Sequence, residues 1–425
     1  MKKVKYWLLT GLIVILMLPG APVSAALLTP TNIGGEAALL VDLDTGQILS
    51  DKDSKTRYPI ASTTKLLTVY LVEQAIKDKQ LNNESEVIIS KDLSEFSENQ
   101  AYSGVPLAEN QKITVHDLIE QTLIASSNAA SIALAEKVSG KVPDFVAKMN
   151  EQLATWGIED AKLVSPSGLP NEDMGVYKIE SMPGDAENKL SARELATVAK
   201  HVIEDFPALL TYTRKQAVET PSRDGMVEIK NTNALLSNGR GYTFEGLKTG
   251  SAVTNGYSFV GLTTLDQQHV ISVVLGNNFD TSNAVFDDTI TMLNQAKKEL
   301  KTVTLPADKM VRKVTVKDAK PNKPYPLRTA TATRFFAPKN FDAKNVGIMT
   351  RGLTAISAPL KKGQEVDRHE LVFLESDNED EYNRLNDMLG NPPYVTLISG
   401  EEVHKADWWT LQLNHIKTFF QTFFE

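Results

Sequence analysis

The sequence predicts an α/β chain in which an antiparallel sheet with a helical subdomain precedes a small all-β domain and a terminal amphipathic helix. Strand-like patterns open and close residues 26–301 and flank a block of helical periodicity, which favours a mixed first domain. Residues 302–402 carry short β-rich stretches separated by Pro and Gly turns, which indicates a separate β domain. Residues 403–425 have an aromatic helical pattern, and residues 1–25 have the pattern of a removable leader.

The leader has the three parts of a secretory signal peptide. Lys2, Lys3 and Lys5 precede the apolar run at 8–18, and small residues follow it up to the expected cleavage site after Ala25. A membrane-spanning anchor is the alternative, but the apolar run is shorter than the roughly 20 residues that a bilayer core requires. We therefore expect a secreted protein, whose formal charge changes from −8 to −11 when the three lysines are removed.

Composition excludes several classes of function. At 425 residues, with 42% hydrophobic and 23% charged residues, the chain is an ordinary globular protein. Its acidic balance argues against nucleic acid as a partner, because nucleic-acid binding depends on concentrated positive charge. The absence of cysteine excludes disulfides, a thiolate nucleophile and Cys-ligated metals. The six histidines form no H-E-x-x-H motif or close pair, so we expect no metal and no cofactor.

The elements of the first domain follow from hydrophobic periodicity. Residues 37–42 and 47–50 flank Leu43-Asp44-Thr45-Gly46, which predicts a β-hairpin whose turn is relieved by glycine. Helical spacing predicts four helices, at 63–77, 115–125, 129–138 and 143–156. The pattern then returns to an antiparallel meander with a final helix, at 246–253, 257–264, 269–275 and 283–300. We expect the N-terminal hairpin to join this later sheet.

The β domain and the last helix are predicted from composition and periodicity. Strand patterns occur at Lys313–Val316 and Tyr394–Ile398, with turns at 321–324 and 361–364. The final segment places large apolar residues on one helical stripe: Trp409, Leu413, Ile416, Phe420 and Phe423, widened by Trp408, Phe419 and Phe424. Polar residues recur too often for a spanning helix, so we favour a helix lying in the membrane interface. The alternative is a helix packed on the protein's own core.

The first chemical motif is Ser62-Thr63-Thr64-Lys65. A serine hydroxyl is a weak nucleophile at neutral pH and needs a nearby base, which Lys65 supplies one helical turn away. Pro59-Ile60-Ala61 leads into a helical pattern, so Ser62 is expected at a helix start, where negative charge is stabilised. Burial would disfavour the charged ammonium and make Lys65 a usable base. The alternative is a capping serine followed by an exposed lysine, a common arrangement.

The second motif, S-x-N, has three copies: Ser97-Glu98-Asn99, Ser126-Ser127-Asn128 and Ser376-Asp377-Asn378. The third has acidic neighbours and lies in the β domain, and the first adjoins no apolar helix. We favour the middle copy, because it lies in a short break between two predicted helices. Ser126 would relay a proton and Asn128 would hold a substrate peptide group. The alternative is that Ser126 and Ser127 cap the following helix.

The third motif is Lys248-Thr249-Gly250 on a predicted strand. A cation, a hydroxyl and a residue without side-chain bulk suit a substrate carboxylate lying along the strand. The backbone N–H of Ser251 then follows as a donor to an oxyanion. Three residues alone carry little weight, but the order of all three motifs is specific.

Together these motifs resemble the low-molecular-mass penicillin-binding proteins of the serine D-alanyl-D-alanine carboxypeptidase family, the penicillin-recognising serine peptidases. Supporting segments are Ala37–Asp42, Ser165-Pro166-Ser167-Gly168-Leu169 and Leu190–Ala196. The resemblance covers nearly the whole mature chain, including the trailing β domain and the amphipathic end. It implies the penicillin-binding/β-lactamase-like transpeptidase fold.

The resemblance also implies an activity and its residues. The expected enzyme is held at the outer face of the bacterial membrane and removes the terminal D-alanine from peptidoglycan stem peptides ending in D-Ala-D-Ala. Ser62 would attack, with Lys65 as base and Ser126 as relay, while Lys248 and Thr249 hold the carboxylate. Backbone N–H groups of Ser62 and Ser251 would form the oxyanion hole. β-Lactam antibiotics would mimic the substrate and trap Ser62.

One departure and two rivals accompany this interpretation. Many relatives carry an arginine near the substrate carboxylate after the K-T-G strand, whereas Asp280-Thr281-Ser282-Asn283 has none. A β-lactamase shares the three motifs, and Glu187-Asn188-Lys189-Leu190 superficially resembles the segment that class A enzymes use for deacylation. Serine follows it where that class has asparagine, and a β-lactamase has no evident use for the β domain. A non-catalytic cell-wall binding protein is the other rival, which the intact motif set disfavours.

Overall fold

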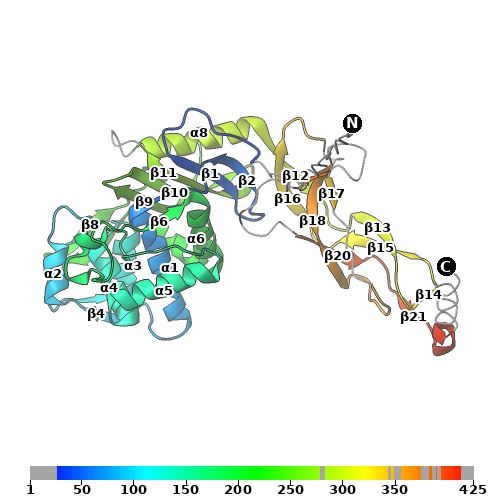
Figure 1. The fold of residues 1–425 in the computed structure, drawn as a ribbon, viewed down its shortest axis with the longest axis horizontal. Coiled ribbons are helices and arrows are strands. Elements are labelled where there is room, and N and C mark those ends of the chain that lie inside the picture. The colour runs from blue at the N-terminus through cyan, green and yellow to red at the C-terminus, as the bar shows by residue number, and fades with distance from the viewer. Residues whose placement is uncertain are drawn as a thin grey trace, which may run out of the picture.

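The structure is a computed structural model that describes residues 26–277, 283–342, 346–348, 356–374, 382–384, 389 and 394–412. The predicted signal peptide, the third S-x-N copy and most of the predicted terminal helix lie outside these residues. The described part is elongated, with a mixed sheet-and-helix region at one end and a β-rich region that extends away from it (Figure 1).

A five-stranded antiparallel sheet forms the centre of the mixed region. Its strand order is β2-β1-β11-β10-β9, so the N-terminal hairpin joins the later meander, as predicted. β1 pairs with β11 from Ala37 opposite Leu275 to Asp42 opposite Val270. The strand bounds are β1 Ala37–Asp42, β2 Ile48–Lys52, β9 Phe244–Ala252, β10 Gly256–Leu265 and β11 Gln268–Asn277.

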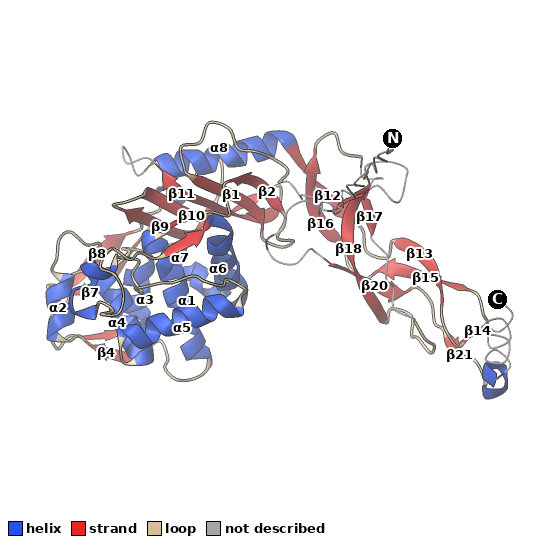
Figure 2. Cartoon of the chain, in the orientation of Figure 1, coloured by secondary structure: helices blue, strands red, loops and turns tan. Residues whose placement is uncertain are grey.

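The sheet is buried on both faces, so its central strands are nearly continuous apolar runs. Along β1 the side chains alternate: Leu39 lies in the core shared with the helical subdomain, and Leu40 lies in the core under α8. Helix α8, Ala284–Glu299, covers one face, and the helical subdomain lies against the other (Figure 2). The final strand β9 is left at an edge of the sheet.

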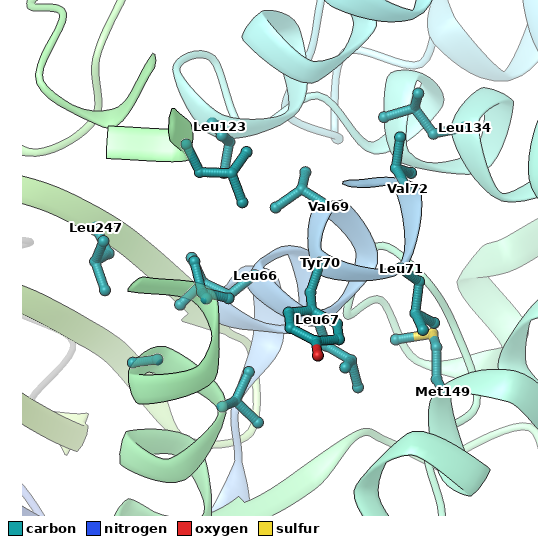
Figure 3. Close-up of a cluster of buried hydrophobic side chains, with 14 of the residues drawn as sticks. Leu66, Leu67, Val69, Tyr70, Leu71, Val72, Leu123, Leu134, Met149 and Leu247 are labelled. Carbon is teal, nitrogen blue, oxygen red and sulfur yellow. The ribbon is translucent and has the colours of Figure 1, made fainter. Parts of the chain in front are cut away.

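The helical subdomain is built around α1. The bounds of its helices are α1 Lys65–Lys77, α2 Lys91–Ser97, α3 Val115–Leu123, α4 Asn128–Ser139, α5 Val142–Thr155, α6 Ala192–Asp205 and α7 Leu210–Thr213. Figure 3 shows Leu66, Leu67, Val69, Tyr70, Leu71 and Val72 of α1 clustered with Leu123, Leu134, Met149 and Leu247. These contacts attach α1 to α3, α4, α5 and β9, and therefore fix the start of α1 against the edge strand.

The four predicted helices are confirmed, with shifted ends. The first begins at Lys65 rather than residue 63, because residues 61–64 form a 3-10 turn. The helix α6 was not predicted, although Ser191 and Glu194 form a capping box at its start. Three two-stranded ribbons complete the region, with strands β3 Arg57–Pro59, β6 Lys189–Ser191, β4 Glu86–Ile88, β5 Lys112–Thr114, β7 Ala217–Ser222 and β8 Gly225–Lys230.

The second region consists of strands, where the sequence predicts a small β domain, and its strands pair antiparallel. Its strands are β12 Leu300–Leu305, β13 Met310–Thr315, β14 Ala319–Lys320, β15 Pro324–Thr329, β16 Thr333–Pro338, β17 Val346–Ile348, β18 Glu365–Leu374, β19 Tyr382–Arg384, β20 Tyr394–Ser399 and β21 His404–Lys405. The Gln47 side chain joins the two regions, because it both donates to and accepts from the backbone of Phe336, each at 2.8 Å.

The C-terminal segment becomes helical at Trp408 and is described to Gln412. Because β21 occupies the preceding residues and pairs with β14, the helical pattern starts later than residue 403. Trp408 and Trp409 are 60% and 72% exposed. Within the described ranges, none of the helices has the length and apolar character that crossing a membrane requires.

Candidate active site

Ser62 lies in the 3-10 turn 61–64, immediately before α1 and facing the edge strand β9. The turn is held by two close backbone approaches. An ideal Cβ at Gly168 would lie 1.9 Å from the carbonyl oxygen of Ala61, and one at Gly250 would lie 2.9 Å from that of Ile60. Glycine is therefore required at both positions, which brings the Ser165–Gly168 loop and β9 against the nucleophile turn.

Lys65 is fully buried, and its amine points at Ser62. Its Nζ lies 2.8 Å from Ser62 Oγ, 2.7 Å from Asn128 Oδ1 and 2.7 Å from the carbonyl oxygen of Ser167. All three contacts are with neutral groups. Burial, reinforced by the nearby Lys248 charge, lowers the pKa of Lys65 well below its ordinary value. A neutral amine at this position can accept a proton from Ser62.

Lys248 is the second buried lysine of the site. It projects from β9, is 1% exposed and donates to the carbonyl oxygen of Thr249 at 3.0 Å. Burial lowers the pKa of Lys248 to about 7. An anion beside this amine would favour its charged form.

Ser126 lies in the break between α3 and α4, as predicted, and lines the same cavity as Ser62. It is 3% exposed, and its hydroxyl has no hydrogen bond to the described part of the chain. Its backbone is left-handed, with φ of +59°, which is uncommon outside glycine and marks a constrained position. Ser127, not Ser126, caps α4 by accepting from Ala130 N at 3.2 Å.

Asn128 opens α4 with a buried side chain. Its Oδ1 accepts from Lys65 Nζ at 2.7 Å, so one end of the amide orients the proposed base. The sequence suggested a substrate contact for this residue, and the structure adds its contact with the lysine. The amide therefore ties the S-x-N break to the S-x-x-K helix.

The edge strand β9 carries the remaining predicted residues. Thr249, Gly250 and Ser251 line the cavity that contains Ser62. Thr232 lines it too, and its hydroxyl lies 2.6 Å from that of Thr249. Sequence reasoning missed Thr232, because it follows β8 in an ordinary polar run, with no motif or periodicity to mark it.

Asn188 is a second residue that sequence reasoning missed, and its hydrogen bonds connect the loops around the site. Its buried side chain accepts from Val164 N at 2.6 Å and from Ser165 N at 3.2 Å. It also donates to the Ser165 carbonyl at 2.8 Å and to Thr64 Oγ1 at 3.0 Å. Asn188 thereby joins the nucleophile turn to the loop whose Ser167 carbonyl holds Lys65. Only the resemblance had drawn attention to that loop.

These residues surround one cavity of about 650 Å³. Its walls come from the nucleophile turn, the S-x-N break, the edge strand and two loops, represented by Ser62, Ser126, Thr249, Tyr102, Asp173 and Glu187. The motifs predicted from sequence therefore converge on one space. The alternative copy at Ser97 does not, because its Oγ donates to Ser94 O at 2.7 Å and accepts from Leu107 N at 2.8 Å.

The sequence pattern of the D-alanyl-D-alanine carboxypeptidases matches residues 24–279, which include every residue of this site. The chain belongs to this carboxypeptidase family. D-alanyl-D-alanine carboxypeptidase DacA of Haemophilus influenzae is 30% identical over 255 residues, covering 58% of this chain and 58% of that protein. The chain thus matches less than two thirds of that relative's length. DacF of Bacillus subtilis is 27% identical over 370 residues, covering 86% of this chain and 89% of that protein.

A solved structure agrees in fold as well. The peptidoglycan synthesis regulatory factor PBP3 from Streptococcus pneumoniae superimposes with a TM-score of 0.73 at 30% identity, covering 88% of this chain and 100% of that one. The match extends beyond the carboxypeptidase region into the β-rich region. The predicted penicillin-binding fold, an antiparallel sheet with a helical subdomain followed by β structure, is therefore confirmed.

Glu187 belongs to the segment that suggested a β-lactamase as an alternative function. It lines the cavity, but both of its carboxylate oxygens accept from Thr254 Oγ1, at 2.8 and 3.0 Å. The carboxylate is thus held at the turn after β9. The hydrogen bonds that hold it come from Thr254, which is not one of the motif serines and lysines.

A separate group, His116, Asp117 and Glu120, places three potential ligand atoms within 4.8 Å of one another. Glu120 is already ion-paired with Lys215. This cation offsets the negative charge of the buried Glu120 carboxylate. The group lies on α3, whereas Ser126 and Asn128, which line the cavity with Ser62, come from the segment after this helix.

Proposed function

We propose that this chain is a serine carboxypeptidase that removes the terminal D-alanine from peptidoglycan stem peptides through an acyl-enzyme on Ser62. The observation that carries the proposal is the buried amine of Lys65, 2.8 Å from Ser62 Oγ and surrounded by neutral partners. Family membership supports the reaction class, and the residue roles below are inferred from the geometry.

Acylation begins when Lys65 takes the hydroxyl proton of Ser62 as the oxygen bonds to the carbonyl carbon of the penultimate D-alanine. The tetrahedral oxyanion is assigned to the backbone N–H groups of Ser62 and Ser251. Collapse breaks the C–N bond, and the proton passes from Lys65 through the Ser126 hydroxyl to the leaving amine. The Ser126 hydroxyl has no hydrogen bond to a described residue, so it is free to donate and accept a proton in this relay.

The terminal carboxylate is assigned to Lys248 and to the hydroxyls of Thr249 and Thr232. A carboxylate beside Lys248 stabilises its ammonium form, which burial alone disfavours. The paired threonine hydroxyls, 2.6 Å apart, add neutral donors where the family arginine is missing from the sequence. Water then attacks the ester, Lys65 takes its proton and returns it to Ser62 Oγ, and the shortened peptide leaves.

We propose that β-lactams acylate the same serine. Ring opening forms the same ester with Ser62, but the leaving amine stays attached to the acyl group and hinders water. We therefore expect a long-lived adduct rather than turnover. Benzylpenicillin therefore serves as a probe for the nucleophile.

The proposed location is the outer face of the cell membrane. Residues 1–25 direct export, and the terminal helix, including exposed Trp408 and Trp409, lies in the membrane interface. We expect truncation after Lys405 to release the protein from sedimenting anionic vesicles. Undiminished sedimentation of the truncated protein would exclude the helix as the anchor.

The function is tested by mass spectrometry and by product release. We expect purified protein incubated with benzylpenicillin to gain one penicilloyl group on the peptide that contains Ser62. The Ser62→Ala variant should gain none and should release no D-alanine from a pentapeptide. D-Alanine release by Ser62→Ala would refute the mechanism, and rapid turnover of benzylpenicillin would identify a β-lactamase instead.

A further inference from the structure

One wall of the reaction cavity carries two carboxylates without a cationic partner. Asp173, from the turn 171–177, and Glu187, next to the buried Asn188, both line the cavity that contains Ser62. No lysine or arginine within the described ranges is ion-paired with either one. Partly buried carboxylates without a counter-ion favour a cationic occupant.

Neutral groups lie next to both carboxylates. Thr254 Oγ1 donates to Glu187 at 2.8 and 3.0 Å, and Tyr102 lines the cavity beside Asp173. The Tyr102 ring is stacked on Phe96 with centroids 5.2 Å apart, which fixes its direction. A carboxylate offers about four lone-pair directions, so each keeps acceptor capacity facing the cavity.

The strand β9 gives the cavity a direction. Thr232 contacts Thr249 at one end of the cavity-facing segment, and Glu187 contacts Thr254 five positions later. Thr254 lies in the turn after β9, so the extended part runs from Thr249 to Ala252 and spans about 10 Å at about 3.3 Å per residue. Ser62 lies between them, because its turn approaches Gly250. A peptide with its carboxylate at Thr249 therefore extends its acyl part toward Glu187.

These carboxylates are part of a ligand site rather than a free-standing acidic patch. Ser126, whose hydroxyl has no hydrogen bond to a described residue, lines the same cavity, so this hydroxyl is available to a molecule bound there. Under the proposed function, that molecule is a stem peptide. The residue that precedes D-Ala-D-Ala in such peptides is a diamino acid, whose side chain ends in an ammonium group when it is not cross-linked.

We propose that Asp173 and Glu187 form a subsite for this side-chain ammonium, so that the enzyme prefers stem peptides whose diamino residue is free over those whose amine is acylated. The inference rests on the proposed function. An acylated amine, as in a cross-link, is neutral and bulkier, and loses the attraction to both carboxylates. The enzyme therefore trims pentapeptides before their amines are used as acceptors.

Matched substrates test the proposal. Release of D-alanine is measured for a pentapeptide with a free lysine side chain and for the same peptide acetylated at that amine. We expect kcat/KM to favour the free amine about 10-fold in the wild type, a typical effect of a partly solvated charge pair. The preference should shrink as ionic strength rises, because salt screens exposed charges.

Variants assign the preference to residues. Glu187→Gln and Asp173→Asn should each reduce the ratio about threefold, and the double variant should bring it near one. Asp185→Asn is the matched control, since Asp185 is an exposed carboxylate of the same segment that does not line the cavity, and its ratio should equal that of the wild type. Circular dichroism checks that each variant is folded.

Three outcomes would overturn the subsite: no wild-type preference, a preference insensitive to salt, or a double variant that keeps the wild-type ratio. An equal loss of turnover for both peptides in Glu187→Gln would identify a deacylating base instead. The wild-type measurements need no variant to fold. Failure of the proposed function is separate, because it would appear as D-alanine release by Ser62→Ala, whatever the substrate preference.

Discussion

Replacing Gly168 with alanine is expected to disable the nucleophile while most of the fold persists. The added Cβ would lie 1.9 Å from the Ala61 carbonyl oxygen and 2.9 Å from Ser62 N, where real Cβ atoms essentially never come within 3.0 Å of such neighbours. The Ser165–Gly168 loop and the nucleophile turn must therefore separate by at least about 1 Å.

The size of the effect follows from what this separation breaks. Ser167, the neighbour of Gly168, supplies one of the three hydrogen bonds that orient Lys65 toward Ser62. A 1 Å misplacement of reacting groups costs about 100-fold in rate, so acylation by benzylpenicillin should slow by about that factor. Overpacking and the left-handed backbone, with φ of +87°, should together lower the free energy of unfolding by about 2–4 kcal/mol.

Gly140→Ala separates crowding from backbone strain. Gly140 has φ of +76°, close to that of Gly168, but a Cβ there meets nothing within 4 Å. We expect this control to lose about 1 kcal/mol of stability and to acylate at the wild-type rate. Stopped-flow acylation and thermal unfolding measure both quantities. Normal acylation by Gly168→Ala, or an equal slowing in Gly140→Ala, would refute the claim that the close contact positions Ser62.

Three further predictions concern the lysines and Thr232. For a peptide with a free carboxylate, kcat/KM should fall above a pH of about 7, because Lys248 of the free enzyme loses its proton there. At saturating substrate, kcat should fall only at higher pH, because the bound carboxylate raises the pKa of Lys248. Lys248→Met should abolish activity but stabilise the protein. The pKa of Lys248 is about 7 in the folded protein and 10.5 for an ordinary lysine. The free-energy cost of burying its charge is therefore greatest below pH 7, where the amine is charged in both states, and vanishes above pH 10.5. Chemical denaturation should show that the variant gains roughly 2–4 kcal/mol in free energy of unfolding at pH 7, and that this gain disappears toward pH 10. A gain that is the same at all pH values would show that burial of the Lys248 charge is not its cause. Thr232→Val should raise KM about fivefold through loss of a hydrogen bond of about 1 kcal/mol, whereas Thr232→Ser should retain the wild-type KM; equal KM values in steady-state assays of the two variants would exclude the role.

Sequence patterns predicted the elements that periodicity describes. The hairpin beginning at Ala37, the helix that contains Lys65 and the strand that contains Lys248 all lie where expected, because each buries a regular apolar pattern. Their convergence on one cavity was predicted only through the order of the motifs and the resemblance. Chain order has no direct relation to distance, so spacing alone does not show that Asn128 reaches Lys65, 63 residues away.

The missed residues share a physical reason. Asn188 and Thr232 act through single hydrogen bonds across loops, and neither periodicity nor composition encodes such contacts. The helix α6 was also missed, although its capping box at Ser191 and Glu194 is a recognisable local signal. Motif residues carry chemistry that is visible in sequence, whereas the residues that hold them in place are visible only after the chain has folded.

Three residues where the motifs meet have a left-handed backbone. Ala61 precedes Ser62, and Ser126 and Gly168 line the cavity; their φ values are +44°, +59° and +87°. For the two non-glycine residues, this conformation costs of order 1–3 kcal/mol each, and it persists only because surrounding contacts fix it. The core around α1 supplies those contacts, since its buried side chains join α1 to β9 and to three helices. The depressed pKa of Lys65 has the same origin, because only closely packed loops exclude water from its amine. Nucleophile geometry and base strength therefore depend on one packing arrangement, so a substitution that loosens these loops should weaken both together, even when Ser62, Lys65 and Lys248 are unchanged.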